Sequence, residues 1–510
     1  MGPLRARVCR PCRDPRALAG WDLVTSHDRG RRYVHDHRSI LRGANVASRG
    51  RAVTAAACLA AVELPEFGAA GPAPELPPAI HRERLARLRE RIEAAGYDRL
   101  VVYADREHSA NLAWLTGFDP RFEEAIAVVG PSNDPAILVG NENWGTAAVA
   151  PLPMRRELHQ ELSLPSQPRD RSRPLGERLA AEGIGRGTKI GVAGWKPLGA
   201  SGRLDVPSYL ADELRSLVGS TGSVENAIGL FIDPADGLRV VNEVDQLAAF
   251  ETAACRTSDG VRHLILGLEP GMTEREAVAL LGWDGTPLSC HLMLTAGPRA
   301  RLGLLSPGDR RIERGDPFTV AFGIWGALNC RAGWVVANAD ELAADVRDYV
   351  DRLVGPYFEA IAEWYGAIRV GQTGGALHEI VASRLGDPFF GIFLNAGHQI
   401  SLDEWVNSPV AEGSTVELRS GMYLQVDVIP ATGTPYFTTN IEDGVALADA
   451  GLRAELARRF PDAWRRIQAR RAFMAEQLGI DLHPDVLPFS NIPAWLPPFL
   501  LDPGRAMTLR

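Results

Sequence analysis

Long apolar runs are absent from this sequence of 510 residues. A helix that crosses a bilayer needs about 20 consecutive apolar residues, and no run of even about 18 occurs here. The stretch most like a signal peptide, residues 49–63, lies well inside the chain and is only weakly hydrophobic. We therefore expect a protein that neither spans nor binds a membrane.

Cysteine and excess basic charge are also scarce. The formal net charge is −8, so no basic excess is available to neutralise phosphates, which argues against nucleic acid as a partner. A small-molecule substrate or ligand is the expected partner. The few cysteines are scattered, which favours a reducing compartment, and hence the cytoplasm, over a disulfide framework. They are Cys9, Cys12, Cys58, Cys255, Cys290 and Cys330.

The first part of the chain differs in composition from the rest. Residues 1–55 contain twelve Arg and four Asp but no Glu or Lys, with little apolar periodicity. We expect residues 1–75 to be a disordered basic extension, and a start codon placed too far upstream would explain it equally well. Cys9 and Cys12 lack a second ligand pair at zinc-binding spacing, so a zinc site is not favoured.

The order of expected elements indicates two domains. Over residues 76–235, apolar runs typical of buried strands alternate with helical patterns, as at Leu85, Leu88 and Ile92. This alternation predicts an α/β domain. Over residues 240–475, strands and helices come in separate runs, which predicts an α+β domain. The proline-rich residues 476–510 are expected to pack as an extended strap.

Five short blocks follow one another in the second domain. They read EPGMTEREA at 269–277, IERGDPFTVAFG at 312–323, AGHQISLDEW at 396–405, LRSGMYLQVDVIP at 418–430 and IEDGVALAD at 441–449. With these blocks, the chain from about residue 80 to about residue 475 resembles the creatinase/aminopeptidase P family of Xaa-Pro peptidases and prolidases. The resemblance implies a creatinase-like N-terminal domain, a pita-bread domain and a homodimer.

The family's metal site is incomplete in this sequence. In the metallopeptidases of the family, two Asp, one His and two Glu hold two divalent metals that generate a hydroxide nucleophile. The resemblance places His398, Asp427 and Glu442 at the last three of these positions. The first two positions fall on Ala321 and Ala332, whose methyl groups cannot bind a cation. We therefore predict a degenerate site with no metal cofactor.

Two further positions differ from the family. The substrate-side His of the family falls on Leu304, and a second His falls on Trp405. Creatinase hydrolyses a C–N bond without a metal, but its working His also occupies the position of Leu304. The mechanism of creatinase therefore cannot operate here unchanged.

The remaining polar residues predict a pocket for a cation. Excess carboxylate suits a cationic or amidine group, and an aromatic ring adds cation–π contact. His398 is the expected acid/base, with Asp427 or Glu442 orienting it. The leading hypothesis is a metal-independent hydrolase or lyase of a C–N bond in a small cationic nitrogen compound. The predicted catalytic residues are His398, Glu404, Asp427 and Glu442, and the predicted substrate-binding residues are Arg331, Trp405 and Gln425.

Two alternatives remain open. In the first, the protein is a non-catalytic binding or scaffold protein, in which His398 bonds to Glu442 and Arg331 pairs with Asp427. In the second, it is a metallo-aminopeptidase with a reduced metal site on His398, Asp427 and Glu442.

A second cluster lies at residues 104–125. It resembles a family segment that approaches the active site of the neighbouring subunit in dimeric members. Arg106, His108 and Arg121 follow a strand end, where open α/β sheets present functional groups, so we predict that they bind substrate. His108 is a second candidate general base, and a solvated charge cluster is the alternative.

Overall fold

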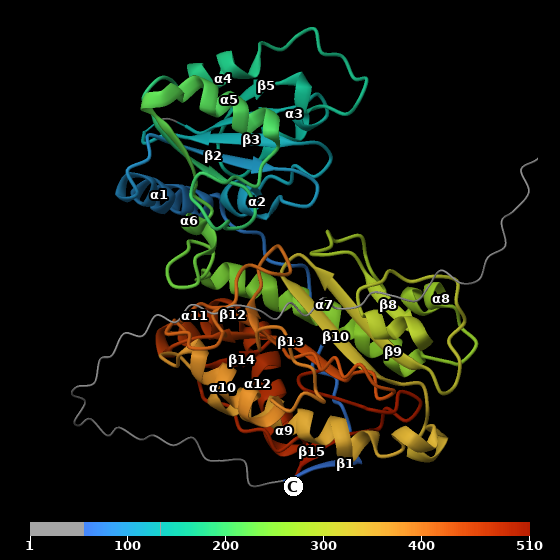
Figure 1. Cartoon of the computed structure of the whole chain (residues 1–510). Helices are drawn as coiled ribbons and strands as arrows, with labels where there is room; N and C mark the ends of the chain where they lie inside the picture. The colour runs from blue at the N-terminus through green and yellow to red at the C-terminus, as the bar shows by residue number, and fades with distance from the viewer. Residues whose placement is uncertain (1–55, 133) are drawn as a thin grey trace, which may run out of the picture. The chain divides into compact units, whose positions relative to one another are not determined.

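The computed structural model describes residues 56–132 and 134–510 (Figure 1). The predictions for Cys9, Cys12 and most of the basic extension therefore lie outside the described residues. Within the described part of the chain, no helix is long and apolar enough to cross a membrane.

The first domain is built on a six-stranded mixed sheet. Its strand order is β5-β4-β3-β2-β6-β7, with β2–β3 and β3–β4 antiparallel and the other three pairs parallel. Helices flank the sheet and separate buried clusters fill its two sides, which confirms the predicted α/β class. The strands are β2 (Arg99–Ala104), β3 (Ala125–Val129), β4 (Ala136–Val139), β5 (Arg155–Leu158), β6 (Lys189–Ala193) and β7 (Ser223–Asn226). The helices are α1 (Pro78–Ala94), α2 (Ala110–Thr116), α3 (Asn143–Thr146), α4 (Leu175–Ala181), α5 (Ser208–Val218) and α6 (Gly229–Ile232).

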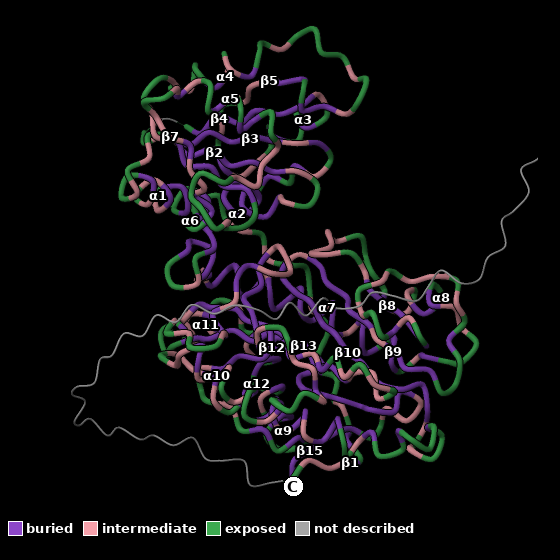
Figure 2. Tube along the Cα trace, in the orientation of Figure 1, coloured by how far each residue is buried: buried purple, intermediate pink, exposed green. Residues whose placement is uncertain are grey.

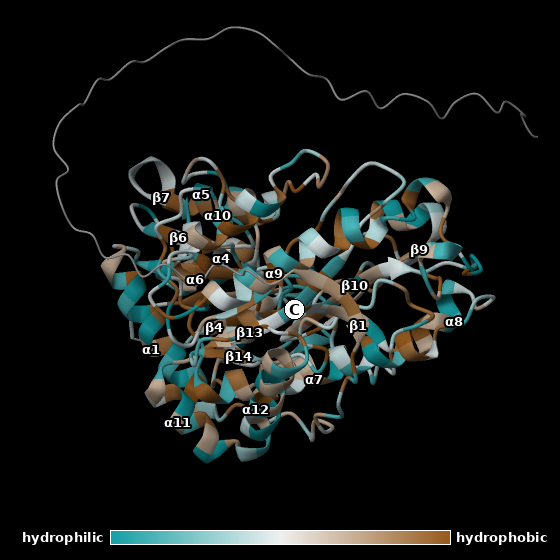
Figure 3. Ribbon diagram, turned by 90° about the horizontal axis from the view of Figure 1, so that it is seen from below, coloured by the Kyte–Doolittle hydropathy of each residue, from teal (hydrophilic) through white to brown (hydrophobic). Residues whose placement is uncertain are grey.

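The apolar spacing explains how α1 packs. Leu85, Leu88 and Ile92 are all buried, as expected for residues three and four positions apart on one helical face. The opposite face carries charged side chains, and α1 is hydrophilic over much of its surface (Figure 3). Gly96, with φ of 71°, then takes the left-handed conformation that lets the chain turn into β2.

The second domain contains a seven-stranded antiparallel sheet. Its order is β11-β12-β13-β10-β9-β8, and β14 also pairs with β13. The long helix α7 (Val244–Gly267) contacts β9 and β10, and strands and α7 alike are largely buried (Figure 2). The strands are β8 (Met293–Ala296), β9 (Pro317–Ile324), β10 (Ala327–Trp334), β11 (His398–Gln399), β12 (Tyr423–Asp427), β13 (Asn440–Leu447) and β14 (Val486–Pro488). The other helices are α8 (Glu274–Ala279), α9 (Gly355–Ala367), α10 (Gly374–Leu385), α11 (Ala450–Arg459) and α12 (Pro461–Glu476).

The terminal segments are more ordered than the composition predicts. Strand β1 (Ala57–Ala61) pairs antiparallel with β15 (Arg505–Leu509), so the prediction of disorder is wrong for residues 57–61. Residues 505–509 contain no proline and form a strand, whereas an irregular strap was expected there. Sequence patterns miss this pairing because Cys58 lies opposite Thr508, 450 positions away.

Candidate functional site

A row of paired residues across the sheet of the second domain forms the site. Ala321 on β9 lies opposite Cys330 on β10, Cys330 lies opposite Glu442 on β13, and Glu442 lies opposite Asp427 on β12. Directly opposed residues in an antiparallel pair project to the same face, so these side chains form a continuous row. His398 on β11 lies opposite Gln425, two residues before Asp427 and therefore on the same face. The fold thus brings His398, Gln425, Asp427 and Glu442 together.

His398 is at the centre of this group. Its Nε2 atom lies 3.3 Å from Oε1 of Glu442 and 3.8 Å from Oδ2 of Asp427, and its side chain is completely buried. Its Nδ1 atom lies 3.2 Å from the carbonyl oxygen of Gln399. Because a carbonyl only accepts hydrogen bonds, Nδ1 carries a proton and donates it there. The hydrogen bond between Nε2 and Glu442 then requires one more proton between those two atoms. The two residues form a pair that shares this proton.

The carboxyl groups beside His398 are held in an unusual electrostatic state. Burial raises the pKa of Glu442 to about 7. Burial, and then the charge of Glu442, raises the pKa of Asp427 well above its ordinary value, and burial also raises the pKa of Glu404. Among the described residues, no Lys or Arg forms an ion pair with any of the three, and Oδ1 of Asp427 has no hydrogen-bond partner. His398 is therefore the only basic side chain paired with these buried carboxyl groups among the described residues.

Gln425 is a structural neighbour of these groups. Its Nε2 donates to the carbonyl oxygen of Leu328 at 2.6 Å, and the residue is fully buried. Its Oε1 atom has no hydrogen-bond partner among the described residues. Gln425 therefore offers the site one free acceptor atom.

Cys330 belongs to the site, although it was not among the predicted site residues. Its Sγ lies 2.7 Å from Oε2 of Glu442. Burial raises the pKa of the Cys330 thiol well above its ordinary value, so the sulfur keeps its proton and donates it to the carboxyl group. Cys330 lies two residues before Ala332 on the same strand, so a period of two counted back from Ala332 would have located it.

Trp405 covers the imidazole ring. The two ring centroids lie 4.1 Å apart with planes inclined at 14°, so Trp405 stacks on His398 where the family places a second His. The segment that carries Trp405 is anchored by an ion pair between Asp403 and Arg239, whose side chain is buried. Glu404, between Asp403 and Trp405 in the sequence, is half-buried. One face of the Trp405 ring is thus occupied by His398.

The predicted role of Arg331 is wrong. Its guanidinium donates to Asp443 at 2.8 Å and to the carbonyl oxygen of Trp495 at 2.7 Å, and both charged side chains are buried. Arg331 neither lines the site nor pairs with Asp427. The physical reason is strand alternation, because adjacent residues point to opposite faces and Cys330 already occupies the site face.

The donor set does not fit a pair of divalent metals. Ala321 and Ala332 are buried on the site face and contribute methyl groups where the resemblance requires two bridging carboxylates. Three side chains remain that offer donor atoms within 4.8 Å of one another, namely His398, Asp427 and Glu442. These donors can surround one positive charge but cannot hold a dinuclear centre.

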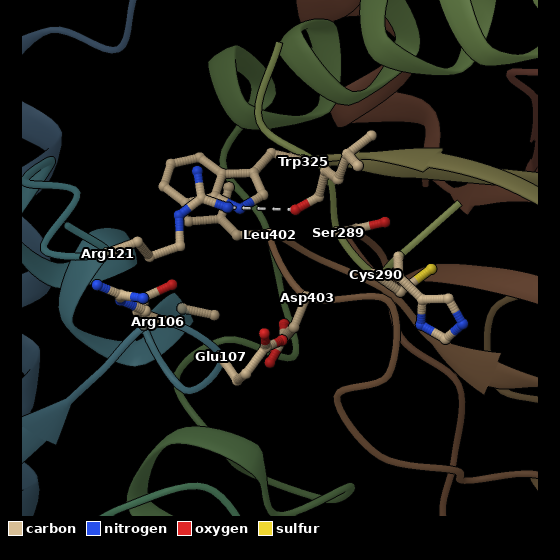
Figure 4. Close-up of a pocket in the computed structure, with 12 residues that line it drawn as sticks. Arg106, Glu107, Arg121, Ser289, Cys290, Trp325, Leu402 and Asp403 are labelled. Atoms are coloured by element: carbon tan, nitrogen blue, oxygen red, sulfur yellow. Dashed lines mark hydrogen bonds between the residues drawn. The ribbon is translucent and has the colours of Figure 1, made fainter. Parts of the chain in front are cut away.

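Within residues 56–132 and 134–510, a cavity of about 420 Å³ adjoins the site. Figure 4 shows Arg106 and Arg121 on one side and Cys290 on the other, with Asp403 beside Glu107 between them. The guanidinium carbon of Arg121 lies 4.4 Å from the centre of the Trp325 ring, and Arg121 donates to the carbonyl oxygen of Leu288 at 3.3 Å. The cavity is lined by Arg106, Glu107, Ser109, Ala110, Arg121, Leu288, Ser289, Cys290, His291, Trp325, Leu402 and Asp403.

Cys290 links the cavity to the carboxyl groups. Burial raises the pKa of its thiol to about 12, and the charges of Glu404 and Glu442 add to the effect, so these groups lie near the sulfur. The cavity thus lies beside the buried acidic group rather than on a distant surface.

His108 does not line this cavity. Its Nδ1 lies 3.1 Å from Oδ2 of Asp105, and its ring packs at 4.8 Å against Trp195. The hydrogen bond that its ring donates to Asp105 is the main reason that the pKa of His108 is raised. The structure therefore brings Arg106 and Arg121 to one cavity and places His108 in a separate cluster.

Comparisons with known proteins agree with this architecture. Residues 84–195 match the creatinase/prolidase N-terminal domain family. An uncharacterised peptidase of Bacillus subtilis, YqhT, is 23% identical over 231 residues, which are 43% of this chain and 63% of the relative. The chain therefore spans less than two thirds of that relative's length.

Solved structures show the same fold at low sequence identity. The prolidase of Pyrococcus horikoshii has a TM-score of 0.56 at 16% identity, over 72% of this chain and 95% of that chain. The Xaa-Pro dipeptidase of Bacillus anthracis has a TM-score of 0.55 at 16% identity, over 73% and 96%. The X-Pro aminopeptidase of Thermotoga maritima has a TM-score of 0.55 at 16% identity, over 72% and 95%. These findings confirm the resemblance drawn from the sequence: the chain carries a creatinase/prolidase N-terminal domain followed by a domain with the pita-bread fold of the prolidases and Xaa-Pro peptidases.

Proposed function

We propose that this protein is a metal-independent hydrolase or lyase that cleaves a C–N bond in a small cationic nitrogen compound. The observation that carries the proposal is the proton-sharing pair of His398 and Glu442 beside the buried carboxyl group of Asp427, which forms no ion pair with a Lys or Arg among the described residues. Peptidases with this fold also cleave C–N bonds, and the loss of donors at Ala321 and Ala332 removes the dinuclear centre from the reaction.

The acidic group supports recognition of a cation. Asp427 and Glu442 have raised pKa values chiefly because burial disfavours their negative charges, and among the described residues no Lys or Arg forms an ion pair with either. A guanidinium or ammonium group can supply the missing positive charge and donate to Oδ1 of Asp427, which has no partner. Binding of such a group then favours the ionised carboxylates and displaces protons from them.

The proton pair supports acid/base chemistry. In hydrolysis, water attacks the carbon, the C–N bond breaks, and the leaving nitrogen takes up a proton. The pair of Nε2 and Oε1 can accept the proton from water and return it to the nitrogen, which is the work of a general acid/base. Asp427, 3.8 Å from Nε2, stabilises the imidazolium that forms when His398 holds the proton.

A second candidate function is ligand binding without catalysis. It is favoured by the complete burial of His398 beneath the stacked ring of Trp405, which keeps the imidazole from direct contact with solvent. Both functions need a cation-binding site, and turnover of a bound compound separates them. A ligand recovered unchanged after prolonged incubation at saturating protein supports the binding protein.

We expect the purified protein to carry fewer than about 0.2 metal ions per chain, because two of the donors required for a dinuclear centre are missing. Elemental analysis after dialysis against divalent metal salts measures this content. The double variant Ala321→Asp with Ala332→Asp is the matched comparison, and it should retain more metal than the wild type. A wild-type content near one or two ions per chain contradicts metal independence.

Small cations should stabilise the protein against heat. Methylguanidine and tetramethylammonium are expected to raise the melting temperature, because a ligand that binds only the native state stabilises it. The rise should be larger at about pH 8 than at about pH 6, since Glu442, with a pKa of about 7, releases its proton on cation binding. A thermal-shift titration measures both effects.

Asp427→Asn is the informative variant in that titration. It should lose most of the stabilisation, whereas Asp212→Asn, which alters an exposed carboxylate on α5, should keep it. Stabilisation by acetate instead of the cations, with no effect of Asp427→Asn, would reject the cationic ligand.

A further inference from the structure

We propose that Cys330 is a positioning residue for the proton pair: its thiol donates to Oε2 of Glu442 and leaves Oε1 to face His398. The inference rests on the proposed function, because it assigns a task to a residue next to the acid/base pair. It concerns a contact that exists without substrate, so it can be tested separately.

The geometry assigns the two oxygens of Glu442 to different partners. Oε2 lies 2.7 Å from Sγ of Cys330, and Oε1 lies 3.3 Å from Nε2 of His398. Cys330 and Glu442 are directly opposite each other on β10 and β13, so the thiol meets the carboxyl group across the strands. The backbone register therefore fixes this contact, and all three residues are buried.

The thiol determines where a proton on Glu442 resides. A protonated carboxyl group can carry its hydrogen on either oxygen, and an oxygen that accepts from a neighbouring donor is the less favourable site. Because Oε2 accepts from Cys330, the proton of Glu442 is directed to Oε1, which faces Nε2. This is the arrangement in which the proton can pass between Glu442 and His398 in one step.

A thiol suits this position better than a stronger donor. Burial, together with the charge of Glu442, raises the pKa of the Cys330 thiol well above its ordinary value, so it stays protonated. The thiol is also a weak donor, so it holds the carboxyl group in place without fixing it in the ionised state. A positively charged Arg would fix the carboxyl group in the ionised state. Ala321, opposite Cys330 on β9, offers no competing acceptor in its side chain.

Infrared spectroscopy of the S–H stretch tests the contact directly, because this band lies in a window free of other protein vibrations. The difference between wild type and Cys330→Ala isolates the band of Cys330, and Cys290→Ala provides the matched band of a neighbouring thiol. We expect the Cys330 band at lower frequency than the Cys290 band, shifting further down as Glu442 ionises near pH 7. In Glu442→Gln this pH-dependent shift should vanish. A Cys330 band at the Cys290 frequency that does not move with pH would overturn the proposal.

The pH dependence of stability gives a second readout. Removing the donor by Cys330→Ala should move the stability change associated with Glu442 to higher pH, because the thiol bond lowers the pKa of that carboxyl group. Cys330→Ser keeps a donor and should restore the wild-type midpoint. A purely structural role would lower stability at every pH without moving the midpoint, and that result would reject a positioning role. If Cys330→Ala does not fold, Cys330→Ser, which also lacks an S–H bond, isolates the band of Cys330 by difference from wild type, and that band still decides the question.

The two proposals can fail independently. A shifted S–H band in a protein that binds no cationic probe would retain the role of Cys330 and reject the proposed function. Cation binding that depends on Asp427, with an unshifted S–H band, would retain the proposed function and reject the role of Cys330.

Discussion

Replacement of Glu442 by Gln is expected to change the free energy of unfolding in a way that depends on pH. Relative to wild type, the variant should gain about 3 kcal/mol between about pH 4.5 and about pH 8. The pKa of Glu442 is raised from 4.5 to about 7 in the folded protein. Between these values the folded state binds more protons than the unfolded state, so wild-type stability falls as pH rises. Gln resembles the protonated carboxyl group and does not incur this loss.

Chemical denaturation at a series of pH values measures the effect. The groups that face Glu442 are Cys330 on β10, Asp427 on β12 and His398 on β11, with Glu404 nearby in the segment after β11. Asp427 also has a raised pKa, so it adds to the fall of wild-type stability as pH rises. Glu455→Gln, on the exposed surface of α11, is the control and should show no such pH dependence. A flat difference between Glu442→Gln and wild type across this range would reject the raised pKa.

Replacement of Arg331 by Met is expected to lower the free energy of unfolding by about 3–5 kcal/mol, because it leaves the buried carboxylate of Asp443 without its partner. The guanidinium and the carboxylate are each only 1% exposed. Arg331 also donates to the carbonyl oxygens of Cys330, Ile492 and Trp495, so its loss removes support from the segment that follows β14. Circular dichroism during urea denaturation measures the loss.

Two further variants separate a structural from a binding role for Arg331. The double variant Arg331→Met with Asp443→Leu removes both charges and should recover much of the stability, since a buried pair can often be replaced by apolar groups. Arg314→Met breaks an exposed pair with Glu341 and should change stability by less than about 1 kcal/mol. Weaker binding of cations by Arg331→Met, at an unchanged free energy of unfolding, would show that Arg331 has a binding role after all.

The fold and the core of the site could be predicted from sequence because short continuous blocks of residues carry the signals for both. The blocks around Gly315, His398, Gly421 and Glu442 carry both the turn chemistry and the site residues, so recognising them located the strands and the four side chains His398, Gln425, Asp427 and Glu442. Gly421, with φ of 90°, illustrates this, because only glycine adopts that turn readily before β12. The alanines at 321 and 332 were likewise visible in the sequence, and they decide that a dinuclear metal centre does not fit.

The predictions that were wrong or incomplete depend on strand geometry rather than on local pattern. Arg331 was placed in the site although strand alternation turns it to the other face, where it meets Asp443. Cys330 was overlooked although the same alternation points it at Glu442. The strand at residues 57–61 was missed because its partner comes from the other end of the chain.

By itself, the sequence determined the α/β and α+β classes of two successive domains, and it showed alanines at two positions where the resemblance implies metal donors. Only the tertiary structure decided which polar side chains share a face, that Trp405 covers His398, and that Glu442 divides its oxygens between Cys330 and His398. The physical reason is that composition and periodicity depend on neighbours along the chain. Strand register and burial depend on residues far apart in sequence, and these set both the contacts and the pKa values of the site.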